Sequence, residues 1–207
     1  MTVARDKYDL DAFYINGEWR NQKTSGDTVD IVNPANADVI GRVTLGTAAH
    51  VDEAASAAKA AFKTFQMTSR AERIDYLEKI LAGYRSRYDD FVEAICLEMG
   101  APIDFSKAAQ APSGTNAIED FINQLKKFEF EEQLDDSDNQ LIYEPKGVCA
   151  LITPWNWPIS QVALKVIPAI AAGCTMVLKP SEIAPLDSML FADMLEEAGC
   201  PAGVFNL

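Results

Sequence analysis

The segment ITPWNWP, residues 152–158, holds one asparagine between two tryptophans and two prolines. Proline fixes φ and removes a backbone donor, and tryptophan favours burial, so the segment predicts a rigid turn that presents Asn156. A fixed carboxamide offers two N–H donors, and one such donor to a developing oxyanion can lower a reaction barrier by about 3 kcal/mol. The alternative is a packing corner in which Asn156 bonds only to local backbone groups.

A second polar segment, KPSE at residues 179–182, combines a cation and an anion three residues apart. A carboxylate after the second strand of a dinucleotide-binding unit is a standard partner for ribose hydroxyls, and a lysine there can donate to the same sugar. Lys179 and Glu182 therefore predict a sugar-binding pair. The alternative is an exposed ion pair with no functional consequence.

Both segments follow apolar runs, residues 148–152 and 174–179, that we expect to be buried strands. Helical patterns over 158–172 and 187–198 and a last run at 203–207 complete a β-α-β-α-β order, which is typical of a parallel sheet covered by helices. Because right-handed crossovers bring successive carboxyl ends to one edge, where ligands bind, the two polar segments are expected side by side. No G-x-G-x-x-G follows the first strand, so the usual phosphate loop is absent.

Residues 1–128 are expected to form strands and then helices. Asn16-Gly17 predicts a β-hairpin, and Asn33-Pro34 predicts a turn between two further strands. Ser69 and Glu72 predict a capping box at a helix start, and Gly100 predicts the end of a helix that begins near Tyr88. A further helix is expected between Pro112 and Phe128. The acidic run over 129–138 predicts a solvated loop and a boundary between two parts of the chain.

The composition is that of a globular protein: of 207 residues, 48% are hydrophobic and 24% are charged. A net charge of −13 argues against nucleic acid as a partner, although it permits a local nucleotide site. Four cysteines without C-x-x-C spacing and a single histidine argue against a metal site, and we expect the cysteines to be small apolar residues. The N-terminus has no apolar signal region and no apolar run is long enough to span a membrane, so the expected compartment is the cytoplasm.

The sequence from 144 to 207 resembles the aldehyde dehydrogenase superfamily. The resemblance rests on PWN at 154–156, PAIAAGC at 168–174, KPSE at 179–182 and AGCPAGVFN at 198–206. FYINGEWR, NPAN and EMGAP extend it over nearly the whole chain. It implies an α/β fold in which N-terminal strands and helices precede a parallel β-α-β-α-β half-sheet, a truncated aldehyde dehydrogenase fold. The implied parts are 1–128 of the cofactor-binding domain, an acidic loop and oligomerisation strand at 129–146, and the first half of the Rossmann-like NAD-binding sheet at 147–207.

The resemblance implies an enzyme that oxidises an aldehyde to a carboxylic acid with NAD(P)+ through a cysteine thiohemiacetal. Asn156 would be the catalytic oxyanion donor, and Lys165 matches a lysine often found behind that asparagine, although it also fits a side chain that extends to water. Because a carboxylate at the ribose would repel a 2′-phosphate, Glu182 predicts NAD+ over NADP+. The implied cofactor-binding residues are Ile152, Thr153, Pro154, Trp155, Lys179, Ser181 and Glu182. Pairing of residues 140–144 between subunits is implied for a homodimer or homotetramer.

The chain departs from the family pattern because the nucleophilic cysteine and the glutamate base would lie beyond position 207. The catalytic domain is therefore expected to be absent, and this chain is expected to be inactive alone. A half-sheet is also expected to expose an apolar edge and face. Two alternatives remain open, a catalytically inactive nucleotide-binding or regulatory fragment and a structural or interaction protein. The sequence does not identify the aldehyde.

Overall fold

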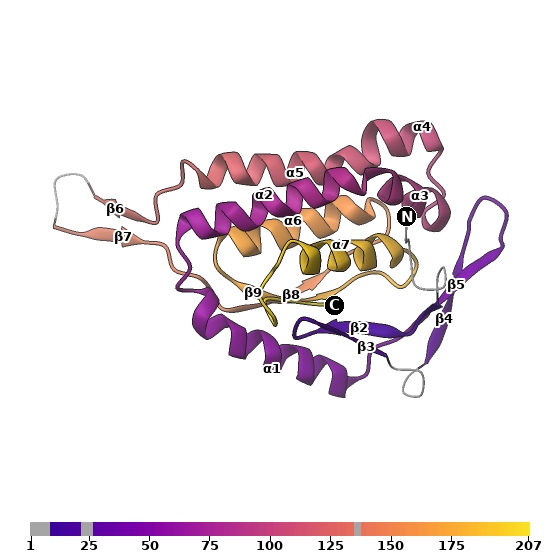
Figure 1. Ribbon diagram of the computed structural model, residues 1–207, viewed down its shortest axis with the longest axis horizontal. Coiled ribbons are helices and arrows are strands. Elements are labelled where there is room, and N and C mark those ends of the chain that lie inside the picture. Colours follow the sequence, from indigo (N-terminus) through magenta and orange to yellow (C-terminus); the bar gives the residue numbers. More distant parts are fainter. Residues whose placement is uncertain (1–8, 22–26, 135–137) are drawn as a thin grey trace.

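A three-stranded parallel sheet lies at the centre of the computed structural model, which describes residues 9–21, 27–134 and 138–207 (Figure 1). Its strands are β8 (Val148–Ile152), β9 (Thr175–Lys179) and β10 (Phe205–Asn206), in the order β10-β9-β8. β8 and β9 are in register over their full length, so their carboxyl ends coincide. The predicted parallel β-α-β-α-β arrangement is confirmed.

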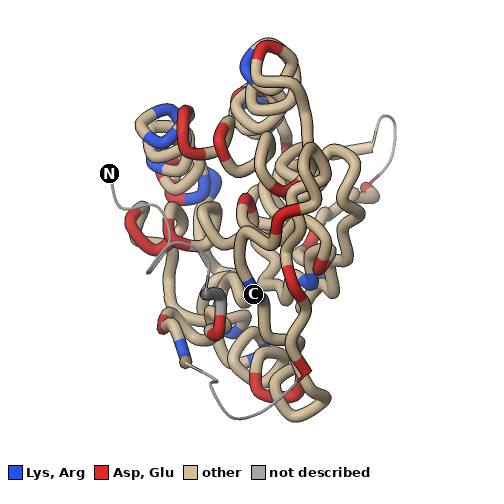
Figure 2. The backbone as a smooth tube through the Cα atoms, turned by 90° about the vertical axis from the view of Figure 1, so that its right-hand side faces the viewer, with Lys and Arg blue, Asp and Glu red and all other residues tan. Residues whose placement is uncertain are grey.

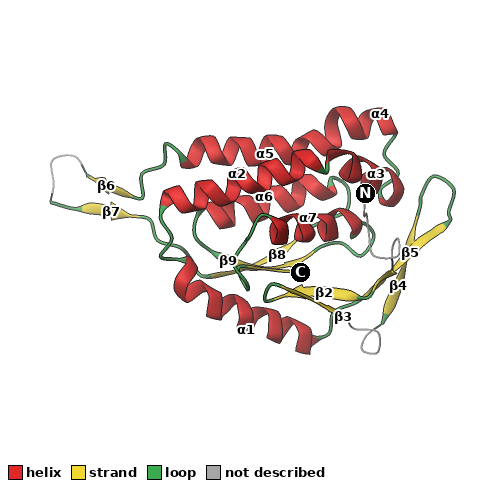
Figure 3. Cartoon of the chain, viewed as in Figure 1, coloured by secondary structure: helices red, strands yellow, loops and turns green. Residues whose placement is uncertain are grey.

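Helices cover the two faces of this sheet unequally (Figure 3). Two helices cross between the strands and pack on one face, with a second helical layer over them, whereas a single helix packs against β9 on the opposite face. The crossing helices are α6 (Pro158–Ala171) and α7 (Leu186–Glu197). The outer layer contains α2 (Arg70–Ser86), α3 (Tyr88–Glu98) and α5 (Ala111–Leu125), and the single helix is α1 (Ala48–Phe65).

The ends of the helices follow the sequence signals. The Ser69 N–H donates to Glu72 Oε2 at 2.7 Å and the Glu72 N–H donates to Ser69 Oγ at 3.2 Å, so the predicted capping box is confirmed. Gly100 follows α3 with φ +75°, the left-handed conformation that glycine adopts without steric cost, as predicted.

The helix expected between Pro112 and Phe128 is confirmed as α5 (Ala111–Leu125), but further helical turns that were not expected precede it. α4 (Ile103–Phe105) and the π-helical segment η1 (Ser106–Gln110) lead directly into α5. Pro112 has no N–H to donate to the preceding turn, and the Tyr88 hydroxyl instead donates to the Lys107 carbonyl oxygen at 2.5 Å. A side chain from another helix thus occupies a carbonyl that the proline leaves free, which local sequence patterns do not reveal.

The predicted hairpin is formed by β2 (Ala12–Ile15) and β3 (Glu18–Asn21), and Asn16 and Gly17 have positive φ at its turn. Tyr14 and Leu207 exchange both backbone hydrogen bonds, at 3.1 and 2.8 Å, so the hairpin is attached to the end of the central sheet. A second three-stranded sheet consists of β1 (Asp9–Leu10), β5 (Val39–Thr44) and β4 (Thr28–Val32).

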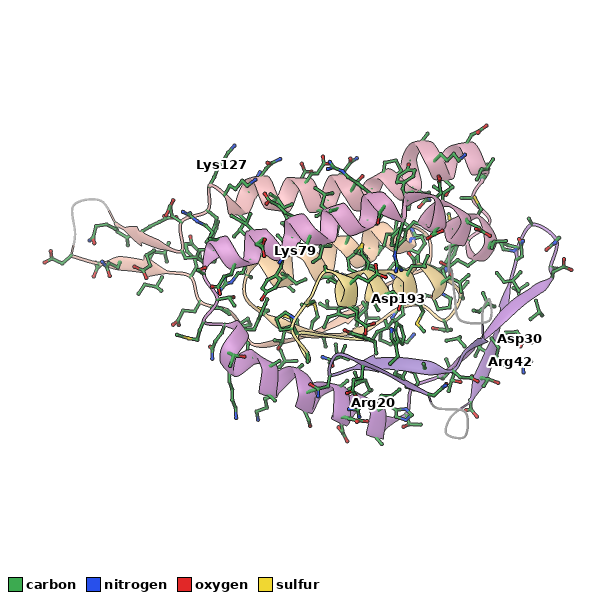
Figure 4. The ribbon with its side chains drawn as sticks, viewed as in Figure 1. Arg20, Asp30, Arg42, Lys79, Lys127 and Asp193 are labelled. Carbon is green, nitrogen blue, oxygen red and sulfur yellow. The ribbon has the colours of Figure 1, made fainter. Side chains whose placement is uncertain are left out.

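Asp30 of β4 and Arg42 of β5 form one of the exposed ion pairs of this outer sheet, with the Arg42 Nε donating to Asp30 Oδ1 at 2.9 Å (Figure 4). Such an exposed pair contributes little to stability. Acidic positions are spread along the chain trace in Figure 2, in keeping with the net charge of −13.

The acidic segment contains a strand where we expected only a loop. β6 (Glu131–Gln133) pairs with β7 (Gln140–Ile142) in an antiparallel hairpin that projects from the body of the molecule (Figure 1). Leu141, Ile142 and Tyr143 of this hairpin are exposed, Ile142 by 56%. The strand was missed because charged residues disfavour strands by propensity, whereas pairing with β7 decides the conformation here.

β8 is the second exception, because it was expected to be buried. Alternate residues along it are exposed, including Val148 at 40% and Ile152 at 70%. Within the described residues, β8 is the last strand of the sheet and pairs with β9 only. The exposed apolar edge and face that were expected of a half-sheet are therefore confirmed, since alternate side chains point to one face and that face of β8 is exposed.

The remaining expectations concern cysteines, metals and membranes. All four cysteines are free thiols; Cys174 is buried and the other three are partly buried. Within the described ranges, no group of three or more His, Cys, Asp or Glu side chains is arranged to hold a metal ion. In the same part of the chain, every helix falls short of the length and apolarity needed to cross a bilayer.

Candidate functional site

The two polar segments meet at the carboxyl edge of the sheet. Ile152 and Lys179 are register partners at the ends of β8 and β9, and the Thr153 N–H donates to the Lys179 carbonyl oxygen at 3.3 Å. The predicted adjacency of these segments is confirmed at the level of the backbone.

Asn156 lies in the loop between β8 and α6, and its side chain is exposed. The helix begins at once after this loop: Pro158 occupies its first turn, and the Gln161 N–H donates to the Trp157 carbonyl oxygen at 2.9 Å. Among the described residues, none forms a hydrogen bond with the Asn156 carboxamide. The amide is therefore held by a stiff backbone and keeps both donors available, unlike the amide of a packing corner.

The two tryptophans beside Asn156 have different surroundings. The Trp157 ring contacts the Phe105 ring edge-on, with 5.8 Å between centroids, so α4 supports the loop from outside. Trp155 is 47% exposed, although tryptophan was expected to favour burial. Pro154 is exposed as well, whereas Thr153 is buried under the loop. Pro154 and Trp155 are thus available to a ligand at the sheet edge.

Lys179 and Glu182 form an ion pair, with 2.7 Å between Nζ and Oε2. The hydrogen bond from Lys179 is the main cause that holds the pKa of the Glu182 carboxyl below its usual range, so Glu182 is a carboxylate at neutral pH. Both side chains remain largely exposed, which leaves donor and acceptor positions for a ligand.

Ser181 has a structural partner. Its hydroxyl oxygen accepts a hydrogen bond from the Ile183 N–H at 3.2 Å, and the side chain is buried within the turn. This contact shapes the turn between β9 and α7. The hydroxyl proton remains available as a donor, so the contact with Ile183 does not preclude cofactor binding by Ser181.

A cavity of about 140 Å³, partly open to solvent, adjoins the second segment. It extends from Lys179, Ser181 and Glu182 to the β2 hairpin and the first turns of α1. Its walls are mostly apolar, and they include Met189 of α7 and Leu207 at the end of β10. A mainly apolar hollow with a few polar groups at one side is the usual form of a small-molecule site.

Sequence reasoning missed two of the cavity walls, Phe13 and His50. Their rings contact each other with 4.7 Å between centroids, and His50 Nδ1 accepts a hydrogen bond from the Thr47 N–H at 3.1 Å. No local pattern indicates this contribution, because both residues are distant in sequence from the central sheet. The hydrogen bonds between Tyr14 and Leu207 bring the hairpin to the cavity.

The cavity and the segment 152–156 lie at the same sheet edge, but they do not form one site in this chain. Residues 152–156 are not among the described residues that line the cavity. Asn156 and Glu182 therefore share the sheet edge, whereas a cleft common to both remains a prediction. Lys165 is half-buried on α6, and no described acidic side chain pairs with it.

Comparisons with known proteins agree with this fold. The sequence profile of the aldehyde dehydrogenase family matches residues 19–207. A 3-succinoylsemialdehyde-pyridine dehydrogenase from a Pseudomonas species is 44% identical over 200 residues, which are 96% of this chain and 41% of that protein. The crystal structure of an aldehyde dehydrogenase from Bartonella henselae superposes with a TM-score of 0.93 at 46% identity, covering 97% of this chain and 42% of that chain.

A crystal structure of an aldehyde dehydrogenase C variant from Pseudomonas syringae, complexed with NAD+ and octanal, superposes equally well. Its TM-score is 0.93 at 42% identity, and the match covers 100% of this chain and 41% of that one. The parallel half-sheet with two polar loops at its carboxyl edge is thus the architecture of a dehydrogenase, and the chain belongs to the aldehyde dehydrogenase family. It spans about 41% of the length of the relatives that it matches.

Proposed function

We propose that this chain is the N-terminal, nucleotide-binding part of an NAD+-dependent aldehyde dehydrogenase that oxidises an aldehyde to a carboxylic acid. The observation that carries the proposal is the meeting of Thr153 and Lys179, which brings an unpaired amide and an exposed Lys-Glu pair to one edge of a parallel sheet. A similar protein has been crystallised with NAD+ and an aldehyde, octanal.

Lys179 and Glu182 have the donor set that an adenosine ribose requires. A carboxylate accepts hydrogen bonds from two vicinal hydroxyls, and an ammonium donates to their oxygen atoms. Both groups lie at a cavity with apolar walls, which suits the sugar of a dinucleotide. Ile152, Thr153, Pro154 and Trp155 would line the continuation of the same ligand along the sheet edge. When bound, NAD+ supplies the acceptor for the hydride of the aldehyde.

The carboxylate also bears on the choice between the two dinucleotides. The ion pair with Lys179 lowers the pKa of Glu182, so its negative charge is retained at neutral pH. A 2′-phosphate on the ribose would meet this charge and lose affinity through repulsion. We therefore infer a preference for NAD+ over NADP+.

Asn156 would donate to the oxyanion formed when a nucleophile attacks the aldehyde. Its donors are exposed and unpaired, and the proline-flanked loop holds them in position before the reaction. Donors that are fixed in advance stabilise the developing charge without a cost of reorientation. Lys165, on the helix that follows, is the nearest described candidate along the chain to assist in positioning the loop.

The nucleophile itself would lie outside this chain. A thiol must ionise to attack a carbonyl. Burial raises the pKa of the Cys149 thiol, and burial raises the pKa of Cys200 to about 12. Neither is suited to nucleophilic attack, and neither Cys96 nor Cys174 belongs to either loop of the site. We infer that the covalent step through a cysteine thiohemiacetal, and the glutamate base, belong to the remainder of the complete protein.

The projecting β6–β7 hairpin would pair with a second copy of the chain. Leu141, Ile142 and Tyr143 are exposed on a strand that has a free edge within the described residues. Exposed apolar strands of this kind are typical of association surfaces. A homodimer or homotetramer is therefore expected of the complete protein.

Calorimetric titration of the 207-residue chain with AMP and NAD+ tests the nucleotide site. Both ligands should bind, because the ribose pair and the cavity are present in this chain. A Glu182→Gln variant should bind AMP at least tenfold more weakly through the lost charge-assisted hydrogen bonds. If neither AMP nor NAD+ binds, the nucleotide-binding function is refuted for the chain and a structural or interaction role is favoured.

Glu119→Gln provides the matched control for this titration. Glu119 is also an exposed glutamate in an ion pair, with Arg85 at 2.5 Å, but it lies on α5 away from the sheet edge. Its substitution should leave AMP affinity unchanged. An equal loss in both variants would show that net charge, rather than the ribose pair, determines binding.

A further inference from the structure

Glu98, at the end of α3, caps a different helix. The Leu186 N–H donates to Glu98 Oε2 at 2.5 Å and the Asp187 N–H donates to Glu98 Oε1 at 3.1 Å. These are the first N–H groups of α7, which have no partner within their own helix. The positive end of the helix dipole also favours a carboxylate at this place. Glu98 thus holds the start of α7 from a position 88 residues earlier in the chain.

A second carboxyl group lies beside this cap. Asp187 is 0% exposed and Glu98 is 1% exposed. Asp187 Oδ1 accepts a hydrogen bond from the Ser188 hydroxyl at 3.2 Å, whereas its Oδ2 is buried without a hydrogen-bond partner. Within the described ranges, neither acid forms a salt bridge with Lys, Arg or His. Two buried carboxylates without a cation would be strongly destabilising.

The groups on the surrounding elements do not relieve this arrangement. Tyr84 of α2, whose pKa is raised by burial and by Asp187, is near the pair, and its hydroxyl donates elsewhere, to the Ala111 carbonyl oxygen at 2.8 Å. From α6, which also packs on α7, Lys165 forms no ion pair with either acid. Arg87, between α2 and α3, pairs instead with Glu197 and with Asp193, which is labelled on α7 in Figure 4.

We propose that Glu98 and Asp187 hold one proton between them in the folded chain, with Asp187 neutral, and that this proton keeps the start of α7 and the preceding site loop in place. Glu98 is the anionic partner because it already accepts two backbone N–H donors. A neutral Asp187 leaves no negative charge on its Oδ2, which is buried without a hydrogen-bond partner.

The titration of the pair supports a proton retained on the two acids, while the two N–H donors to Glu98 place that proton on Asp187. Burial raises the pKa of Asp187 to about 7, and burial and then the Asp187 charge raise the pKa of Glu98. An unfolded aspartate has a pKa of about 3.9, so between that pH and about 7 the folded chain binds more protons than the unfolded one. Stability must then fall as the pH rises through this interval, because the unfolded state releases its proton first.

The pair is connected to the candidate nucleotide site through the chain. α7 begins at Leu186, four residues after Glu182, so a displaced first turn of α7 would move the carboxylate of the ribose pair. This step rests on the proposed nucleotide-binding function. It makes Glu98 and Asp187 positioning residues, and it predicts weaker nucleotide binding when the shared proton is lost.

Urea unfolding of the 207-residue chain and of Asp187→Asn between pH 4 and 8.5 tests the shared proton. Asparagine is a neutral mimic of protonated aspartic acid. The urea midpoint of Asp187→Asn should equal that of the native chain near pH 4 and should exceed it at pH 8. An infrared band of a buried carboxylic acid should be present in the native chain at pH 6 and absent from Asp187→Asn. The proposal would be overturned if the urea midpoints of the two proteins changed with pH in the same way, or if the infrared band were the same in both.

Glu98→Gln is the matched counterpart. The NH₂ group of the glutamine would face backbone N–H donors and could not accept their hydrogen bonds. Glu98→Gln should therefore lower the unfolding midpoint, also at each pH at which Asp187→Asn does not lower it. A midpoint equal to that of the native chain would refute the capping role of Glu98. If Glu98→Gln does not fold, the Asp187→Asn profiles still decide the question.

AMP titrations of the native chain and Asp187→Asn at pH 6.5 and 8.5 test the link to the site. Comparing two proteins at the same pH cancels the ionisation of the AMP phosphate itself. The AMP affinity of the native chain should be severalfold lower at pH 8.5 than at pH 6.5, whereas the AMP affinity of Asp187→Asn should be the same at both pH values. Equal pH dependence would overturn the link. Absence of AMP binding at both pH values would instead refute the proposed nucleotide function, while the unfolding profiles would still report on the proton.

Discussion

The Thr153 N–H donates to the carbonyl oxygen of Lys179 at 3.3 Å, one position beyond the last register pair of β8 and β9. This hydrogen bond extends the strand pairing into the two loops that carry the candidate chemistry. The loop with Asn156 and the turn with Glu182 therefore start from a common, fixed point.

Replacement of Glu182 should relax the choice between NAD+ and NADP+. In the complete enzyme, Glu182→Gln should raise the ratio of kcat/KM for NADP+ to that for NAD+ about tenfold, because the repulsion of a 2′-phosphate is removed. The pKa of Glu182 is lowered by Lys179, so the native preference for NAD+ should persist as the pH falls to 6. Steady-state kinetics with both dinucleotides measure this ratio. A native enzyme that uses NADP+ as efficiently as NAD+ would contradict the assignment.

Two glycines at helix ends should tolerate alanine unequally. Gly173 follows α6 with φ +78°, and a Cβ there would lie 2.5 Å from Arg73 Nη2. Gly199 follows α7 with φ +74°, and a Cβ there would meet nothing within 4 Å. Gly199→Ala should cost about 1 kcal/mol of unfolding free energy for the left-handed backbone alone. Gly173→Ala should cost about 2 kcal/mol more for displacing packed atoms, as measured by urea denaturation. Equal costs would show that Arg73 moves aside freely.

The sequence predicted the helix end at Gly100 and the parallel half-sheet because their signals are local. A hydrophobic run, a capping pair or a terminal glycine acts within one element, so Ser69 with Glu72 and Gly100 lie at helix ends as predicted. The adjacency of the two polar segments was also predictable, because the handedness of β-α-β units determines it. The helical turns before α5 were not, since the Lys107 carbonyl finds its partner on Tyr88 of another helix.

The parts of the site that escaped sequence analysis depend on contacts between distant residues. Phe13 and His50 reach the cavity only because the β2 hairpin is bonded to Leu207. The cap from Glu98 to Leu186 and Asp187 likewise joins residues about 90 positions apart, where no periodicity applies. Burial of β8 was overestimated because its apolar run fits a central strand, whereas in this chain it ends the sheet.

The projecting hairpin should determine the oligomeric state. In the complete protein, Ile142→Asp places a charge on an apolar residue that is 56% exposed, so it should shift a dimer or tetramer toward smaller species without loss of fold. Val39→Asp serves as the control, because Val39 is 57% exposed on β5, at the opposite end of the molecule from the hairpin (Figure 1). Sedimentation velocity measures the distribution of species. An unchanged distribution for Ile142→Asp would exclude β7 from the subunit interface.

Arg73 should be the most costly arginine to replace. Its guanidinium is 5% exposed and donates to the carbonyl oxygens of Ala171 and Gln66, at 3.3 and 3.2 Å, at the ends of α6 and α1. Arg73→Met keeps much of the apolar volume but leaves these carbonyls without a donor, so unfolding free energy should fall by about 3 kcal/mol. Arg85→Met, which removes only an exposed pair with Glu119, should cost less than about 1 kcal/mol. Equal urea midpoints for the two variants would refute a structural role for Arg73.

Asn156 should matter for the rate of reaction and little for cofactor affinity. In the complete enzyme, Asn156→Ala should lower kcat about a hundredfold or more, because it removes a donor to the oxyanion that forms only in the transition state. The dissociation constant of NAD+ should stay nearly the same, since the carboxamide makes no hydrogen bond that shapes its loop among the described residues. Asn123→Ala is the control, an exposed asparagine on α5 whose loss should change neither quantity. Pre-steady-state kinetics with fluorescence titration of NAD+ separate the two effects. An Asn156→Ala enzyme with the native kcat would remove this amide from the mechanism, and a parallel loss of NAD+ binding would assign it to the cofactor instead.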